Sequence, residues 1–205
     1  MLCKLPIEVS MSTAILPSFA RQGSAPGVPL LTAEEFVARY EGQRVELVRG
    51  IVEELPMPWN NHGFVCGEIT WAISAFVKAR DLGRVSTNDS WMRTRRMPDT
   101  VRGPDVGYFS YARQPKGPVP EGFLELSPEL VVEVKSPSDS WPKIFAKANE
   151  YLTADVLIVV LLDPATRSAT VCRAGVPPEK LAGTEELTFP DLLPGFTVTI
   201  GSLFV

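Results

Sequence analysis

The segment Leu130-Val131-Val132-Glu133-Val134-Lys135 decides the fold, because it is an apolar run that carries two charges. Side chains alternate between the two faces of a strand, so every second residue from Leu130 is predicted to point into a core. Glu133 and Lys135 then share the opposite face. A charge on such a strand is costly to bury unless it is paired or bound to a metal ion. The segment therefore predicts a central strand whose charged side chains are paired or bind a metal ion.

A second carboxylate, Asp105, begins another expected strand at residues 105–110. The chain between Asp105 and Glu133 is long enough for a strand, a loop and a return strand, so the two carboxylates can meet. Two carboxylates and a strand carbonyl, such as that of Val134, are ligands that a hard divalent cation prefers. Lys135 could then orient or activate a water molecule. The alternative is a Glu133–Lys135 pair on a solvated face, which is the commoner case for spacing alone.

The rest of the chain predicts an α+β protein with a mixed central sheet flanked by helices and preceded by a helix and a hairpin. Thr32 and Glu35 have the spacing of a capping box, and Ser140 can cap a helix that has Pro142 at its first position. The expected helices cover residues 32–40, 62–80 and 142–151. The expected strands or hairpins cover residues 45–48, 51–55, 84–96, 105–110, 129–135, 156–162, 167–173 and 197–200.

The two ends of the chain differ in character. Residues 1–29 mix Pro, Ser, Gly and Ala without hydrophobic periodicity, which predicts a flexible leader, with either Met1 or Met11 as the start. Residues 30–205 are expected to form a single domain.

Composition excludes several classes of protein. The 205 residues carry a formal net charge of −4, and the pI is about 5.2. A general polyanion binder is thus excluded, and any nucleic-acid contact must come from a local patch. The three cysteines are odd in number and far apart, which excludes a disulfide framework and suits a reducing cytoplasm. The longest apolar run, residues 156–162, is of strand length, so no membrane span is expected.

A series of short motifs follows one order along the chain: Glu46-Leu47-Val48-Arg49-Gly50, His62, Pro104-Asp105, Glu133-Val134-Lys135 with Ser136-Pro137-Ser138, Lys147 with Tyr151, Leu162-Asp163-Pro164 and Leu193-Pro194-Gly195-Phe196. In this order they resemble the PD-(D/E)XK nuclease superfamily and, more closely, the Uma-two family of restriction-endonuclease-like proteins. One departure is Thr153-Ala154-Asp155-Val156, where relatives usually carry a Gly before the strand and an aromatic residue inside it.

The resemblance implies a restriction-endonuclease-like fold and a site for Mg²⁺ or Mn²⁺. By that similarity Asp105 and Glu133 would be metal ligands, Lys135 the catalytic lysine, and Glu46 an additional acidic residue near the metal. Taken from the residues alone, Glu46 can equally be the polar side of an edge hairpin.

His62 and Lys147 are accessory candidates. His62 is the only histidine, and a structural hydrogen bond is as good an explanation as catalysis. Lys147 lies one helical turn from Lys143, which favours a solvated face, whereas the functional alternative is that it reaches the metal cleft. Trp59, Trp71 and Trp141 are predicted to pack rather than to stack on bases.

Arginines are concentrated between positions 84 and 116, where seven positive and three negative charges occur. Arg93, Arg95 and Arg96 lie beside Trp91, a pattern that fits a surface tracking a phosphate backbone. The alternative is a solubilising basic loop.

These observations lead to one functional hypothesis and two alternatives. The first is a metal-dependent endonuclease that hydrolyses phosphodiester bonds of DNA, without a nucleotide cofactor because no ATP-binding loop is visible. A homodimer is expected because two cuts in a duplex need two sites. The alternatives are a non-catalytic nucleic-acid-binding or regulatory module with the same fold, and a purely protein-binding accessory.

Overall fold

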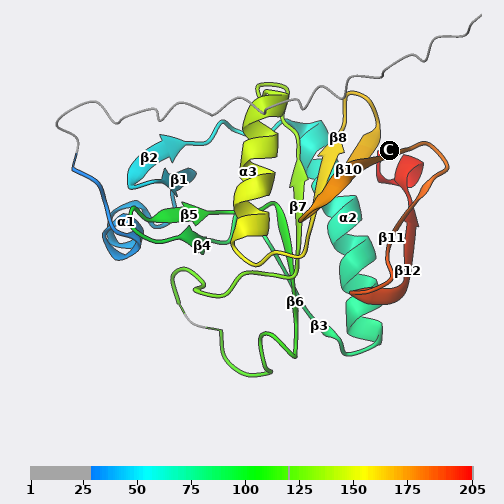
Figure 1. Cartoon of the computed structure of the whole chain (residues 1–205), viewed down its shortest axis with the longest axis horizontal. Coiled ribbons are helices and arrows are strands. Elements are labelled where there is room, and N and C mark those ends of the chain that lie inside the picture. Colours follow the sequence, from blue (N-terminus) through cyan, green and yellow to red (C-terminus); the bar gives the residue numbers. More distant parts are fainter. Residues whose placement is uncertain (1–28, 120, 205) are drawn as a thin grey trace, which may run out of the picture.

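The computed structural model describes residues 29–119 and 121–204, arranged around a six-stranded mixed sheet. Figure 1 shows the elements of this sheet and the helices around it. The predicted leader therefore lies, except for Pro29, outside the described residues. The predicted α+β class with a mixed central sheet is confirmed. Within the described ranges, no helix is long and apolar enough to cross a membrane.

The central sheet has the strand order β10-β9-β8-β7-β6-β3. β7 runs parallel to β8, and every other neighbouring pair in this sheet is antiparallel. Both faces of β7 are covered, so its apolar residues alternate between two cores. The strands are β3 Gly83–Thr87, β6 Val106–Ser110, β7 Leu130–Val134, β8 Ile158–Asp163, β9 Ser168–Arg173 and β10 Val176–Ala182.

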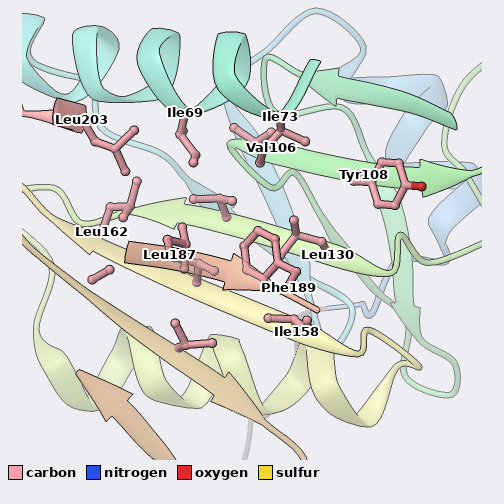
Figure 2. Close-up of a cluster of buried hydrophobic side chains, with 14 of the residues drawn as sticks. Ile69, Ile73, Val106, Tyr108, Leu130, Ile158, Leu162, Leu187, Phe189 and Leu203 are labelled. Carbon is pink, nitrogen blue, oxygen red and sulfur yellow. The ribbon is translucent and has the colours of Figure 1, made fainter. Parts of the chain in front are cut away.

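One face of this sheet packs against α2 (Asn60–Ala79), with the hairpin β11 (Glu186–Phe189)–β12 (Leu193–Thr199) and the 3-10 helix η1 (Ile200–Leu203) beside it. Figure 2 shows Ile69 and Ile73 of α2 on the same side of the sheet as Val106 and Leu130. The other face packs against α3 (Trp141–Thr153), where Val131 lies in a cluster with Tyr151. The predicted alternation of Leu130 and Val131 between two faces is thus confirmed.

A smaller, four-stranded sheet has the order β2-β1-β5-β4 and packs against α1 (Ala33–Tyr40). α1 begins with the predicted capping box of Thr32 and Glu35. β1 lies between β2 and β5, so Glu46 is on an interior strand and not on an edge hairpin. The strands are β1 Val45–Val48, β2 Ile51–Glu54, β4 Met92–Arg95 and β5 Thr100–Arg102.

The hairpin alternative for residues 84–96 is wrong, because β3 and β4 belong to different sheets. β3 pairs with β6 in the central sheet, whereas β4 pairs with β5 in the smaller one. The chain turns between them at Asn88 and Asp89, both of which have a positive φ. Asn and Asp tolerate that conformation better than most residues. The polar pattern of residues 84–96 predicts an extended segment, but it does not indicate which strand that segment pairs with.

Several strands have no clear signal in the sequence. β10 begins Val176-Pro177-Pro178, and two prolines argue against a strand. The prolines are tolerated because β10 is an edge strand whose register shifts between Val176 and Glu179.

At the start of α3, Ser140 has the extended backbone of an N-cap residue, but its side chain makes no capping hydrogen bond. Pro142 is the second residue of the helix and not, as predicted, the first.

The prediction that Trp59 and Trp71 pack inside the protein is wrong. Their exposed fractions are 70% and 71%, and Trp141 is 37% exposed. Trp59 precedes α2 as its N-cap residue, and Trp71 falls outside the buried stripe of that helix, which is formed by Val65, Ile69, Ile73 and Val77.

This difference in burial predicts a large loss of stability for one substitution on α2 and a small change for its neighbour. Ile73→Ala opens a cavity in the core and should lower the free energy of unfolding by about 2–5 kcal/mol. Trp71→Ala removes an exposed side chain and should change it by less than about 0.5 kcal/mol. Urea denaturation of both variants measures the difference. Equal losses in the two variants would contradict the difference in burial between Ile73 and Trp71.

Candidate active site

Asp105 and Glu133 meet because β6 and β7 pair antiparallel. Val106 lies opposite Val132, and extending this register by one residue sets Asp105 opposite Glu133. Asp105 Oδ2 accepts a hydrogen bond from the Val134 backbone N–H at 2.7 Å. This hydrogen bond lies just beyond the last paired residues of β6 and β7, and it holds the Asp105 carboxylate against the end of β7.

Glu133 is buried and makes direct contacts with two side chains of α3. The Tyr151 hydroxyl donates to Oε1 at 2.7 Å, and the Lys147 ammonium lies 2.9 Å from Oε1 and 3.0 Å from Oε2. Burial raises the pKa of Glu133 to about 7. The charge of Lys147 opposes this rise, whereas the carboxylates of Asp105 and Glu46 add to it. Glu133 therefore gives up its proton less readily than an ordinary glutamate does.

The lysine in contact with Glu133 is Lys147, and the solvated-face alternative for it does not hold. Its side chain is only 18% exposed, and its ammonium also lies 3.1 Å from Glu46 Oε1. Burial alone would lower the pKa of Lys147, but the two carboxylates outweigh it and keep the amine charged. Lys135 follows the end of β7 and donates to the Ser136 carbonyl at 3.3 Å, with its Nζ 5.8 Å from the ring centre of Trp141. The pairing of Glu133 with Lys135 is thus replaced by a pairing with Lys147.

Glu46 is buried at the middle of β1, 2% exposed, and is held by three donors. Besides Lys147, Arg102 Nη1 donates to its Oε2 at 2.8 Å, and the Gly103 N–H donates to Oε1 at 3.1 Å. Burial acts to raise the pKa of Glu46, but Lys147 and Arg102 together hold it below its ordinary value. The pKa of Glu46 is therefore lowered while that of Glu133 is raised, although both carboxyls share Lys147.

Arg102 links this site to α3 through a bidentate ion pair. Its Nε and Nη2 each lie 3.0 Å from a different oxygen of Glu150. The Thr94 hydroxyl also donates to Glu150, at 2.6 Å. Two parallel donors fix a carboxylate in orientation as well as position.

His62 stands on the other side of Asp105, in the first turn of α2. Its Nε2 is 3.4 Å from Asp105 Oδ2, and its Nδ1 is 3.5 Å from the Cys66 sulphur. Burial would lower the pKa of His62, but the hydrogen bond and charge of Asp105 raise it above its ordinary value. Burial raises the pKa of the Cys66 thiol, and Asp105 adds to that effect. Asp89 is close enough to influence both groups and is itself paired with Arg44 at 2.9 Å.

The donor set at the end of β7 suits a hard divalent cation. Asp105 and Glu133 supply carboxylate oxygens from opposite register positions. The N–H and C=O of one residue in a parallel pair point to the same side, so the Val134 carbonyl faces the side on which its N–H meets Asp105. Two carboxylates and one carbonyl are oxygen donors of the kind that Mg²⁺ and Mn²⁺ take.

The three arginines predicted to contact a phosphate backbone differ in environment. Arg93 is 7% exposed, ion-paired with Glu34, Asp99 and Glu125, and 4.8 Å from the ring centre of Phe123. This guanidinium is committed to the protein, so the expected phosphate contact does not fit Arg93. Arg95 and Arg96 are exposed, and Arg96 also contacts Glu125 at 2.7 Å.

Sequence reasoning did not single out Arg102 and Glu150 as parts of the site. Arg102 lies in the arginine-rich segment but is buried, because β5 turns it toward Glu46. The one signal in the sequence for Glu150 is its position relative to the candidate Lys147. Lys147, Glu150 and Tyr151 have the helical spacing that places them on one side of α3.

The double contact of Lys147 predicts a large structural role. Lys147→Ala leaves the buried carboxylates of Glu46 and Glu133 without their shared cation and should lower the free energy of unfolding by about 3–5 kcal/mol at pH 8. Lys143→Ala on the same helix removes a 68% exposed side chain paired with Glu53 and should cost less than about 1 kcal/mol. Chemical denaturation of the two variants checks this, and equal effects would contradict the buried bridge.

Comparison with known proteins shows the family and the fold of the chain. The Uma2 family model, described as "Putative restriction endonuclease", matches residues 33–201. A crystal structure from Anabaena variabilis ATCC 29413, described as "a putative nuclease belonging to DUF820", matches with a TM-score of 0.74 and 22% identity, covering 85% of this chain and 97% of that one. At this identity the likeness shows a shared fold. No curated protein matches the chain. Because the family model spans most of its length, the chain belongs to the Uma2 family.

Proposed function

We propose that this protein is a metal-dependent endonuclease that hydrolyses phosphodiester bonds of DNA. The observation that carries the proposal is the meeting of Asp105 and Glu133 across two paired strands, beside a buried lysine. Membership of a family described as restriction endonucleases supports a nuclease. The alternative of a solvated Glu133–Lys135 pair is disfavoured because Glu133 is buried.

Asp105, Glu133 and the Val134 carbonyl would hold Mg²⁺ or Mn²⁺. Such an ion, when bound, lowers the pKa of coordinated water and offsets the negative charge that develops on a phosphodiester. Glu46 contributes negative charge behind these ligands, and its own oxygens are engaged by Arg102, Gly103 and Lys147. Its role in the proposal is therefore to hold Lys147 in place.

The side chains around the ligands fix their orientation. Tyr151 and Lys147 hold Glu133 by three contacts of 3.0 Å or less, so its carboxylate does not need to reorganise during the reaction. Lys135 is partly exposed at the end of β7, where a substrate phosphate could approach it. In our proposal its ammonium orients the attacking water and stabilises charge on the phosphate oxygens.

The nucleic acid would meet the protein at exposed cationic groups. Arg95 and Arg96 lie at the end of β4, beside a hollow that is also lined by Arg113, Ala154 and Asp155. Ala154 follows α3 seven residues after Lys147, or about 10 Å along the helix. A nucleic-acid backbone bound along this line would reach both the exposed arginines and the region of Lys147. Two cuts in a duplex would require two copies of the site, which a homodimer supplies.

One observation favours a second function, a nucleic-acid-binding or regulatory module without turnover. Both oxygens of Glu133 are already bonded inside the protein, and Lys135 is turned toward Ser136 and Trp141. A site of this kind would bind a divalent cation without cutting.

Cleavage assays on supercoiled and single-stranded DNA distinguish the two functions. The wild type should cleave with Mg²⁺ or Mn²⁺, and Asp105→Asn should abolish cleavage. Lys135→Ala should slow cleavage by about 10²–10⁴-fold while leaving the Tm unchanged. Lys143→Ala is the matched control and should cleave as the wild type does. Full cleavage by both Asp105→Asn and Glu133→Gln would refute the endonuclease, and binding of Mg²⁺ and DNA without cleavage by the wild type would support the second function.

The raised pKa of Glu133 predicts how Mg²⁺ affinity depends on pH. Below a pKa of about 7 the carboxyl holds a proton that the cation must displace, so affinity should rise by up to about tenfold per pH unit until pH 7 and then level off. Calorimetric titration between pH 5.5 and 8.5, in two buffers of different ionisation enthalpy, measures the affinity and the protons released. His62→Gln separates the contribution of His62, whose pKa is also raised. A flat profile across this range would contradict the assignment of Glu133 as a ligand.

A further inference from the structure

Three side chains with different donor atoms meet beside the carboxylate pair. His62 and Cys66 lie one helical turn apart on α2, and Asp105 faces them from the start of β6. A ring nitrogen, the thiol sulphur and a carboxylate oxygen all lie within 4.8 Å of one another. The proposed endonuclease chemistry uses Asp105 but assigns no role to the thiol.

We propose that His62, Cys66 and Asp105 form a binding site for Zn²⁺. Nitrogen, sulphur and oxygen donors together suit a borderline-soft ion with tetrahedral coordination, whereas Mg²⁺ takes oxygen ligands. Zn²⁺ binds its ligands at about 2.0–2.3 Å in this geometry, which places neighbouring donor atoms about 3.3–3.8 Å apart. One donor atom from each of the three residues lies within 4.8 Å of the other two, which is slightly wider than that spacing. His62 faces Asp105 through Nε2 at 3.4 Å and Cys66 through Nδ1 at 3.5 Å, and one of these two nitrogens would bind the ion.

The surroundings of the three donors also favour a cation. Asp89 and Glu133 both lie near enough to act on the charges of His62 and Cys66. Asp105 is held by the Val134 N–H through Oδ2, which fixes one ligand before the ion arrives. His62 and Cys66 are held by the helix itself, because residues four apart lie on the same side. Binding would therefore require only small movements of side chains.

Asp105 belongs both to this site and to the one proposed for Mg²⁺. Resting on the proposed function for this one step, we expect Zn²⁺ to take Asp105 away from Mg²⁺ and so to act as an inhibitor. The Zn²⁺ site itself does not depend on nuclease activity. It stands on the positions of His62, Cys66 and Asp105 alone.

Cobalt substitution tests the site in the full chain. Co²⁺ takes the coordination of Zn²⁺, and its bond to a thiolate gives a charge-transfer absorption band in the near ultraviolet. The experiment uses a Cys3→Ala background and a phosphine reductant, so that only Cys66 and Cys172 carry thiols. The background protein should develop the band at one equivalent of Co²⁺, and one equivalent of Zn²⁺ should remove it. Cys66→Ala should lose the band, whereas Cys172→Ala, the matched control in the core beside α3, should keep it.

Further measurements keep the result interpretable. His62→Ala should weaken Co²⁺ binding by at least about tenfold, and circular dichroism melts in the absence of metal verify that each variant is folded. If Cys66→Ala does not fold, Cys66→Ser serves in its place, because a hydroxyl gives no thiolate band. A band that persists without Cys66, or no band in the background protein, would overturn the proposal.

The effect on Mg²⁺ is measured by binding rather than by turnover. Calorimetry should show Mg²⁺ affinity falling by at least about tenfold after one equivalent of Zn²⁺ in the wild type, and not in Cys66→Ala. A cobalt–thiolate band in a protein that cleaves no DNA would refute the proposed nuclease and leave the Zn²⁺ site intact. Cleavage with Mg²⁺ in a protein that gives no band would do the reverse.

Discussion

The Lys147 ammonium, lying between Glu46 and Glu133, is the contact on which the rest of the site depends. Glu46 belongs to the smaller sheet, Glu133 to the central sheet, and Lys147 to the helix that covers the central sheet. The Lys147 ammonium therefore links the smaller sheet, the central sheet and α3. Removing water from these groups is costly, and the geometry compensates by giving every one of them at least two partners.

The two carboxylates share one amine but differ in their other donors, so they are not equivalent. Glu46 also receives Arg102 and the Gly103 N–H, and its pKa is held below the ordinary value. Glu133 shares Lys147 but has a neutral hydroxyl, that of Tyr151, as its other donor, and its pKa rises to about 7. The same polypeptide thus contains one carboxyl whose pKa is lowered and one whose pKa is raised, and the difference follows from their other donors.

The sequence predicted the central strand, the pairing of Asp105 with Glu133 and most helices, because these follow from periodicity and strand alternation. It could not assign β3 and β4 to different sheets, since a polar strand pattern does not name its partner. It placed Lys135 beside Glu133 from spacing along one strand, whereas the actual partner, Lys147, comes from a helix 14 residues away in sequence. Arg93 has the composition of a phosphate contact but is enclosed by carboxylates from three other segments. Such long-range contacts depend on tertiary packing, which no local pattern encodes.

The distribution of charge explains why a cation would bind at Asp105 rather than at the other acidic groups. Glu46 has Lys147 and Arg102, Glu150 has Arg102, and Asp89 has Arg44. Asp105 is joined by a backbone N–H and by His62, which carries charge only when protonated. Glu133 has the Lys147 ammonium, which it shares with Glu46. A divalent cation placed between Asp105 and Glu133 would add to the neutralisation that Lys147 begins, whereas the nitrogen of His62 and the sulphur of Cys66 would favour a softer ion on the other side of Asp105.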